Sequence, residues 1–216
     1  MILEQYHNIA DLPAHLPIFP LSGALLLPRW SLPLNIFEPR YLQMIDDALA
    51  GNRIIGMIQP ADDEAGSDKL ANVGCAGRVT SFSETDDGRY LINLTGICRF
   101  IVAGEIESQT AYRQVKASWL GYEHDLVPDK DTEPFDRKAL LAALKYFTKQ
   151  NNMDVDWAAI ETAPMETLIN ALSAGCPLTM IERQALLEAP TLSSRAEVLI
   201  SLLNMNDASD EKMTLQ

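Results

Sequence analysis

Residues 16–41 read LPIFPLSGALLLPRWSLPLNIFEPRY, and this stretch decides the fold class of the first half of the chain. Its short apolar runs, LPIFPL, ALLL and LPLNIF, predict three β-strands, because short apolar segments between turn residues are typical of strands. Proline cannot donate to a β-ladder, so we expect these strands to be confined to edges, starts or bulges by Pro17, Pro20, Pro28 and Pro33. The stretch therefore predicts a small twisted sheet or barrel.

A single helix is expected directly after these strands, in the sequence EPRYLQMIDDALAG. Pro39 suits the first position of a helix, and Gly51 supplies a stop at its end. Between them, apolar residues recur at helical spacing on one face. These residues are Tyr41, Leu42, Ile45 and Leu49.

Strands are expected again from Arg53 to about Leu120. The Asp87-Gly88 step lies between two apolar runs, VGCAGRVTSFSE and RYLINLTGICRFIVAGEI, and predicts a β-hairpin. The later run AYRQVKASWLGY alternates apolar and polar residues, the pattern of a half-buried strand.

The second half of the chain has helical periodicity instead. Residues 134–150 and 165–174 each carry an apolar stripe, and two capping boxes, Thr179 with Glu182 and Ser194 with Glu197, predict further helix starts. The acidic, proline-bearing segment between the halves is the best linker candidate. The expected organisation is a β-rich subdomain over 1–122, a linker over 123–134 and a helical bundle over 135–216.

Composition limits the partners that the chain can have. Its 216 residues carry a formal net charge of −13, which repels nucleic acid and anionic membranes. The chain begins without a basic and apolar leader and has no apolar run long enough to span a bilayer. Its three cysteines include no CxxC pair, so we expect neither disulfides nor zinc, and a cytoplasmic location.

Residues 16–41 resemble the opening of the substrate-binding N-terminal domain of Lon proteases, which has an LPLFPL segment and an IFEPRY block. The GICRF segment and the closing helices of residues 182–203 are similar to that family too. The resemblance implies an α+β fold: a PUA-like β-rich pseudobarrel with one inserted helix, followed by a C-terminal α-helical bundle. The residues that match the family motif are Pro20, Phe37, Glu38, Pro39, Arg40, Tyr41, Gly96, Arg99 and Phe100.

The resemblance implies binding rather than catalysis. The chain has no GxxxxGK[ST] phosphate loop, and no serine and lysine are placed as a peptidase pair, so we expect a free-standing, non-enzymatic module without cofactor. Its implied partners are unfolded or partly folded proteins and peptides, in an adaptor or chaperone-like role. One alternative is a small molecule or modified residue held in a groove of the β half. Self-association into a homodimer, through Trp30 or the strand edges, is a further expectation.

The candidate binding surface is the apolar stretch that contains Leu27, Trp30 and Leu32. Exposed apolar side chains or an unpaired sheet edge are what a module that captures polypeptide needs. Here the chain departs from the family, which has Pro-Gly where this sequence has Pro28-Arg29. That difference puts an arginine at a position that favours positive φ.

Two sets of polar residues are interpreted as non-functional: the first supports the fold, and the second lies on the surface. Glu38 and Arg40 flank Pro39 at the expected helix start, and Arg99 is predicted to pair with Glu38, because an unpaired buried charge is costly. His7, His15 and His124 have no partner at metal-ligand spacing, so no metal is assigned.

Overall fold

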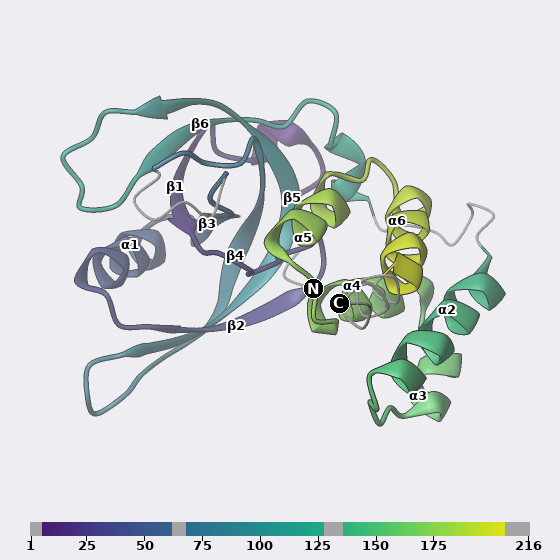
Figure 1. Cartoon of the computed structure of the whole chain (residues 1–216). Coiled ribbons are helices and arrows are strands. Elements are labelled where there is room, and N and C mark those ends of the chain that lie inside the picture. Colours follow the sequence, from purple (N-terminus) through teal and green to yellow (C-terminus); the bar gives the residue numbers. More distant parts are fainter. Residues whose placement is uncertain (1–5, 62–67, 128–135, 206–216) are drawn as a thin grey trace, which may run out of the picture. The chain divides into compact units, whose positions relative to one another are not determined.

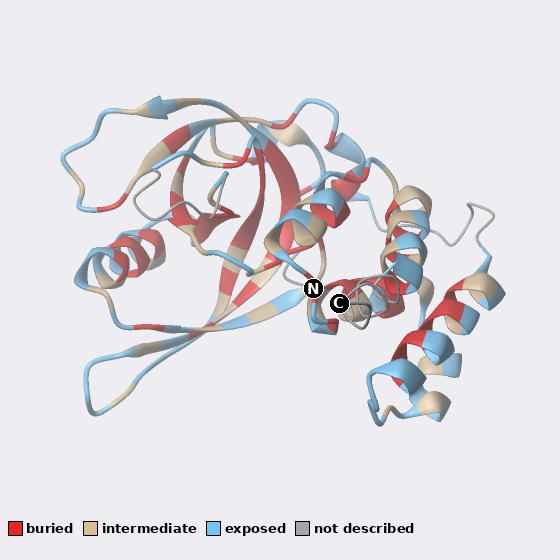
Figure 2. Cartoon of the chain, in the orientation of Figure 1, coloured by how far each residue is buried: buried red, intermediate tan, exposed pale blue. Residues whose placement is uncertain are grey.

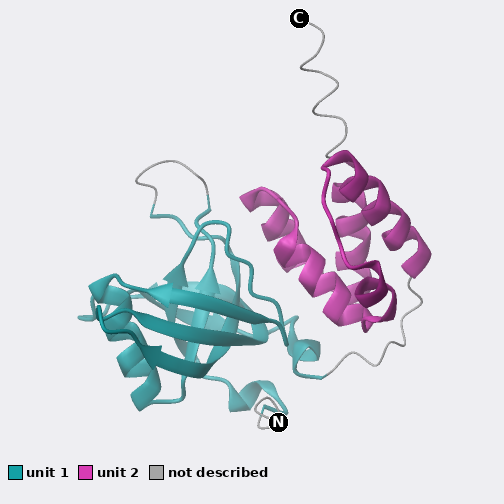
Figure 3. Cartoon of the chain, turned by 90° about the horizontal axis from the view of Figure 1, so that it is seen from below, with its two compact units in different colours: residues 1–128 teal, residues 129–216 magenta. Residues whose placement is uncertain are grey.

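The structure is a computed structural model that describes residues 6–61, 68–127 and 136–205. The chain divides into two compact units, unit 1 from Met1 to Pro128 and unit 2 from Asp129 to Gln216 (Figure 3). Unit 1 is built on a sheet and unit 2 on helices, so the fold class is α+β, as the sequence predicts.

Unit 1 contains a six-stranded sheet that closes on itself (Figure 1). Its order is β2-β5-β4-β3-β1-β6, and β5 also pairs with β6, so five strands form a barrel and β2 lies outside it on β5. Only the pairing of β1 with β3 is parallel among the named strands. The strands are β1 His15–Pro20, β2 Ser31–Ile36, β3 Ile54–Ile58, β4 Val73–Glu84, β5 Tyr90–Ile106 and β6 Gln114–Ser118.

The inserted helix α1 spans Pro39–Ala50, with proline in its first turn and Gly51 as its C-cap. Its apolar face is buried and consists of Tyr41, Met44, Ile45 and Ala48. The described residues of unit 1 also form two short 3₁₀ helices, η2, Ile9–Asp11, and η3, Glu123–Leu126.

The core of unit 1 fills the barrel. Figure 2 shows buried residues along β3, the first half of β4 and the central part of β5, and exposed residues over most of the hairpin between β4 and β5. Phe100 is fully buried and its ring lies edge-on to that of Trp119, with 6.1 Å between the centroids. The role of Phe100 in the family motif is therefore to pack in the core.

The described part of unit 2, residues 136–205, contains the helices α2 Arg137–Gln150, α3 Trp157–Thr162, α4 Met165–Gly175, α5 Met180–Glu188 and α6 Leu192–Met205. Its separate core takes side chains from α2, α4, α5 and α6, among them Leu140, Phe147, Ile169, Leu186 and Leu199. The capping box of Thr179 and Glu182 forms at the start of α5, as predicted.

Three details differ from expectation. The run ALLL is not a strand, although Leu25, Leu26 and Leu27 are buried, because it packs into the core without joining a ladder. Helix α6 begins at Leu192, so Ser194 lies within its first turn and is not the N-cap that the sequence predicts. The backbone N–H of Ser194 instead donates to Thr191 Oγ1. The expected linker begins with η3, which belongs to unit 1, and residues 128–134 lie outside the described residues.

No helix among the described residues is long and apolar enough to cross a membrane.

Candidate functional site

A tight turn over Leu27–Trp30 leads into β2. The N–H of Trp30 donates to the carbonyl of Leu27 at 3.0 Å, and Arg29 has a φ of 62°. Since the ring of Pro28 holds its φ near −65°, a positive φ at the next residue defines a type II turn. The prediction that this turn needs a positive φ is confirmed. Arg29 occupies the position, where glycine would adopt the same φ without strain.

The turn is clamped onto Gly96 of β5. The N–H of Gly96 donates to the carbonyl of Trp30 at 2.9 Å, and the N–H of Arg29 donates to the carbonyl of Gly96 at 2.9 Å. A Cβ atom at position 96 would lie 2.0 Å from the carbonyl oxygen of Leu27. Close backbone approach therefore explains why the motif residue here is glycine.

The side chain of Arg29 partly offsets its backbone strain. Its Nη1 donates to the backbone carbonyl of Asp125 in η3, which ties the turn to the end of unit 1. The turn thus carries two opposed contributions, a strained dihedral and a stabilising side-chain contact.

We expect Arg29→Ala to be less stable than Arg29→Gly by about 1 kcal/mol in the free energy of unfolding. Both variants lose the contact with Asp125, but only glycine relieves the positive φ. Urea denaturation of the two variants side by side measures the difference. Equal stabilities would show that the dihedral costs nothing.

A buried ion pair joins β5 to η3. The guanidinium of Arg99 donates from Nε to Asp125 Oδ2 at 2.8 Å and from Nη2 to Oδ1 at 2.8 Å. The backbone N–H of Arg99 also donates to Oδ2, at 2.9 Å, and the two side chains are only 1% and 4% exposed. The prediction that Arg99 pairs with Glu38 is therefore wrong; Glu38 pairs with Arg40, at 2.8 Å.

Aromatic and polar neighbours complete the surroundings of Arg99. Its Cζ atom lies 4.2 Å from the centroid of the Tyr122 ring, and its Nη2 lies 3.1 Å from His124 Nε2. Burial opposes the charge, but the hydrogen bonds with Asp125 outweigh it and raise the pKa of Arg99. Arg99 therefore stays charged, and its ion pair with Asp125 joins β5 to η3 rather than acting as an acid or base.

Strand β2 presents an unpaired backbone edge. Among the described residues, β2 pairs with β5 alone, over Ser31–Ile36. The carbonyl of Trp30 points toward β5, so alternate residues from Leu32 to Ile36 do the same. The backbone groups that point away belong to Ser31, Pro33 and Asn35, and proline occupies the middle position, where no ladder N–H is required.

Aromatic residues stand at both ends of this edge. Trp30 precedes β2 and is partly exposed, and Phe37 follows it and is 63% exposed. Near Phe37, where Ile36 pairs with Tyr90, the hairpin adds Phe82, which is 42% exposed and lies 4.8 Å from the Tyr90 ring. We call this set, the β2 edge with Trp30, Phe37 and Phe82, the β2 surface.

The sequence-predicted binding residues only partly coincide with the β2 surface. Leu27 is fully buried, so its prediction as a contact residue is wrong; its side chain belongs to the core. Leu32 is partly buried and lies on β2. Phe37 and Phe82 were not predicted as binding residues, because an apolar residue in a strand pattern gives no sign of which side chains the sheet leaves uncovered.

Metal-ligand residue types and cysteines were candidates for chemistry elsewhere in the described part of the chain. No cluster of His, Cys, Asp or Glu among the described residues could hold a metal ion. Burial raises the pKa of the Cys98 thiol and raises that of Cys176 to about 11. Both therefore remain thiols at neutral pH, which makes them poor nucleophiles.

The fold of the chain and the IFEPRY sequence at the start of α1 agree with a comparison to protein families. A family model, described as the substrate-binding domain of the ATP-dependent protease La (Lon), matches residues 15–205. The chain belongs to this family.

Lon proteases are among its curated relatives. The chain is 27% identical to the Lon protease of Flavobacterium johnsoniae over 212 residues, which cover 94% of this chain and 25% of that protein. It is 26% identical to Lon protease 2 of Myxococcus xanthus over 91% of this chain and 24% of that protein. The chain thus spans about a quarter of the length of these relatives.

Two solved structures share the fold. The Lon N-terminal domain protein from Xanthomonas campestris superposes with a TM-score of 0.62 at 22% identity, covering 88% of this chain and 98% of that one. The N-terminal domain of the Mycobacterium avium complex Lon protease gives a TM-score of 0.59 at 15% identity, with the same coverage.

Proposed function

We propose that this chain is a non-catalytic module that binds extended segments of unfolded or partly folded polypeptides along the β2 surface. The observation that carries the proposal is the unpaired edge of β2 between two aromatic residues. An extended peptide can add a strand to such an edge, with backbone hydrogen bonds supplying affinity and side-chain contacts supplying selectivity.

The dimensions of β2 define the segment that it would accept. Six residues of strand extend over about 20 Å, so a peptide of about six residues would cover β2, and one of about eight residues would reach from Trp30 to Phe37. Apolar side chains at alternate positions would share a face with Leu32 and Leu34, which are partly buried. Native proteins bury such segments, so the edge would select unfolded ones.

Pro33 sets a limit on the strength of this interaction. It removes one outward N–H from the centre of the edge, and prolines on edge strands oppose aggregation between sheets. The edge therefore offers N–H groups at Ser31 and Asn35 alone, together with the three outward carbonyls. Such an edge suits reversible capture, as an adaptor or a holder of unfolded chains requires.

Substitution of Phe37 tests the proposal. We expect Phe37→Ser to weaken binding of a fluorescently labelled, reduced and alkylated protein by about tenfold, which corresponds to loss of one aromatic contact. Fluorescence anisotropy titration gives the dissociation constants. Trp30→Ser should weaken binding in the same direction.

Leu120→Ser is the matched control. Leu120 is 65% exposed, close to the 63% of Phe37, and also belongs to unit 1. It follows β6, which pairs with the other end of β5 from the one that pairs with β2. The proposal fails if the two substitutions reduce affinity equally, or if neither does. Pairing of β2 with a second copy would instead appear as a concentration-dependent dimer that Phe37→Ser weakens in sedimentation.

A further inference from the structure

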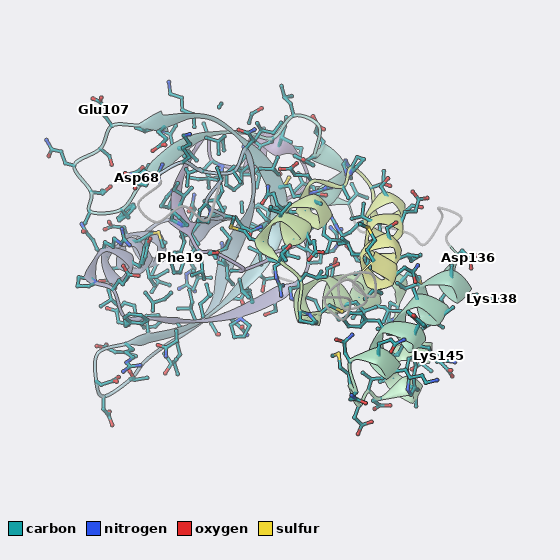
Figure 4. All side chains as sticks on the ribbon, in the orientation of Figure 1. Phe19, Asp68, Glu107, Asp136, Lys138 and Lys145 are labelled. Carbon is teal, nitrogen blue, oxygen red and sulfur yellow. The ribbon has the colours of Figure 1, made fainter. Side chains whose placement is uncertain are left out.

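Unit 1 contains a small polar pocket whose lining residues are not part of the β2 surface. Its volume is about 200 Å³, and residues from separate segments line it: the start of α1, the segment before Leu70 and the connection that enters β6. The charged and aromatic residues among them are Arg40, Tyr41, Asp68, Lys69, Tyr112 and Arg113. Figure 4 labels Asp68, and also Phe19, whose ring packs against that of Tyr41.

The charge of this lining contrasts with that of the whole chain. Three cationic side chains and one carboxylate line the pocket, in a protein whose net charge is −13. Segments distant in sequence supply the cations, so the fold brings them together despite their mutual repulsion. Glu38 and Glu105, outside the lining, pair with the two arginines, so the positive charge of the lining is partly offset and suits a ligand with a single negative charge.

Two of the cations are held in place in advance. Arg40 donates from Nε and Nη2 to Glu38, at 3.0 and 2.8 Å, and its guanidinium lies over the Tyr41 ring. Arg113 donates from Nε and Nη2 to Glu105, at 3.1 and 2.5 Å. Within the described part of the chain, Nη1 of neither arginine makes a hydrogen bond, so each retains donors in a fixed orientation.

The tyrosines fix the wall of the pocket. The hydroxyl of Tyr112 donates to Asp47 Oδ2 of α1 at 2.8 Å, so its ring holds the β6 connection against the helix. Burial and this hydrogen bond raise the pKa of Tyr112 to about 12, so it stays neutral. The hydroxyl of Tyr112 therefore adds no negative charge of its own to the lining.

We propose that this pocket binds a carboxylate group. Guanidinium groups match the planar carboxylate and bind it through paired hydrogen bonds. A doubly charged phosphate is disfavoured, because Asp68, Glu38 and Glu105 surround the arginines with negative charge. A volume of about 200 Å³ is below the roughly 300 Å³ at which drug-sized ligand sites begin, so only a small acid or the end of a larger ligand fits.

The carboxylate has two sources, a free small acid or the C-terminus of a polypeptide. Either source supplies the same planar, singly charged group to the two arginines. This proposal goes beyond polypeptide capture along β2 and does not rest on it, since none of the pocket residues belongs to the β2 surface.

The test is isothermal titration of the full chain at constant ionic strength with acetate, succinate, inorganic phosphate, and a short peptide as free acid and as C-terminal amide. We expect saturable binding of a carboxylate and at least about tenfold weaker binding to Arg40→Gln/Arg113→Gln. Arg113→Lys, which keeps the charge but not the paired donors, should fall between. Arg89→Gln is the matched control, since Arg89 also forms an exposed ion pair, with Asp87, and is not part of the pocket.

Each outcome either identifies the source of the carboxylate or contradicts the proposed carboxylate site. Binding of the peptide acid but not the amide identifies a polypeptide C-terminus, and binding of acetate or succinate alone identifies a small acid; both support the proposal. It is overturned if no carboxylate binds the wild type, if phosphate binds more tightly, or if correctly folded Arg113→Lys and Arg89→Gln bind the carboxylate equally well.

Discussion

Gly96→Ala is expected to destabilise unit 1 by at least about 3 kcal/mol, enough to leave much of it unfolded at physiological temperature. The added Cβ would lie 2.0 Å from the carbonyl oxygen of Leu27 and 2.8 Å from its carbonyl carbon. These atoms are backbone, so no side-chain rotation relieves the clash. The turn would have to separate from β5, breaking the hydrogen bonds that Gly96 makes with Arg29 and Trp30.

Circular dichroism during urea denaturation measures this loss. Gly175→Ala, at the end of α4, is the control, because outside its chain neighbours and the backbone of its own helix no atom lies within 4 Å of the Cβ that it would add. We expect the control to change stability by less than about 1 kcal/mol. A Gly96→Ala protein as stable as the control would refute the close contact between the turn and β5.

Asp125→Ala is expected to cost about 3–5 kcal/mol, because it leaves the Arg99 charge buried without its carboxylate. The substitution also removes the acceptor for the backbone N–H of Arg99. Thermal and urea unfolding of unit 1 give the change in free energy. The double variant Arg99→Met/Asp125→Ala should be more stable than Asp125→Ala alone, because no buried charge remains.

Which of these two variants is the more stable distinguishes an effect of the buried ion pair from an effect of packing alone. If the cost of Asp125→Ala came only from lost packing, the double variant would be the less stable one. That result, or full stability of Asp125→Ala, would contradict the pairing of Arg99 with Asp125.

Local signals in the sequence predict most elements of the fold. Pro39 and Gly51 mark the ends of α1, and Asp87-Gly88 marks the hairpin between β4 and β5, because each residue imposes its own backbone geometry. The closed barrel and the helical second half follow from the family resemblance and from the change in periodicity.

Long-range contacts could not be predicted in the same way. Arg99 required a buried carboxylate, but its partner lies 26 residues away in an acidic segment that has the composition of a linker. In the sequence, Leu27 looks the same whether its side chain is buried or exposed. Only the close contact of its backbone with Gly96, and its burial in the structure, show that the turn packs against β5. The outward edge of β2 likewise depends on strand order, which local sequence does not encode.

The proposed binding mode is tested most directly by amide hydrogen exchange of β2, measured by NMR with and without a saturating peptide of alternating apolar residues. The outward N–H groups of Ser31 and Asn35 should exchange at least about tenfold more slowly when the peptide is bound. Those of Leu32 and Leu34, which point toward β5, should change little. Unchanged exchange at Ser31 and Asn35 while the peptide is bound would contradict strand addition to β2.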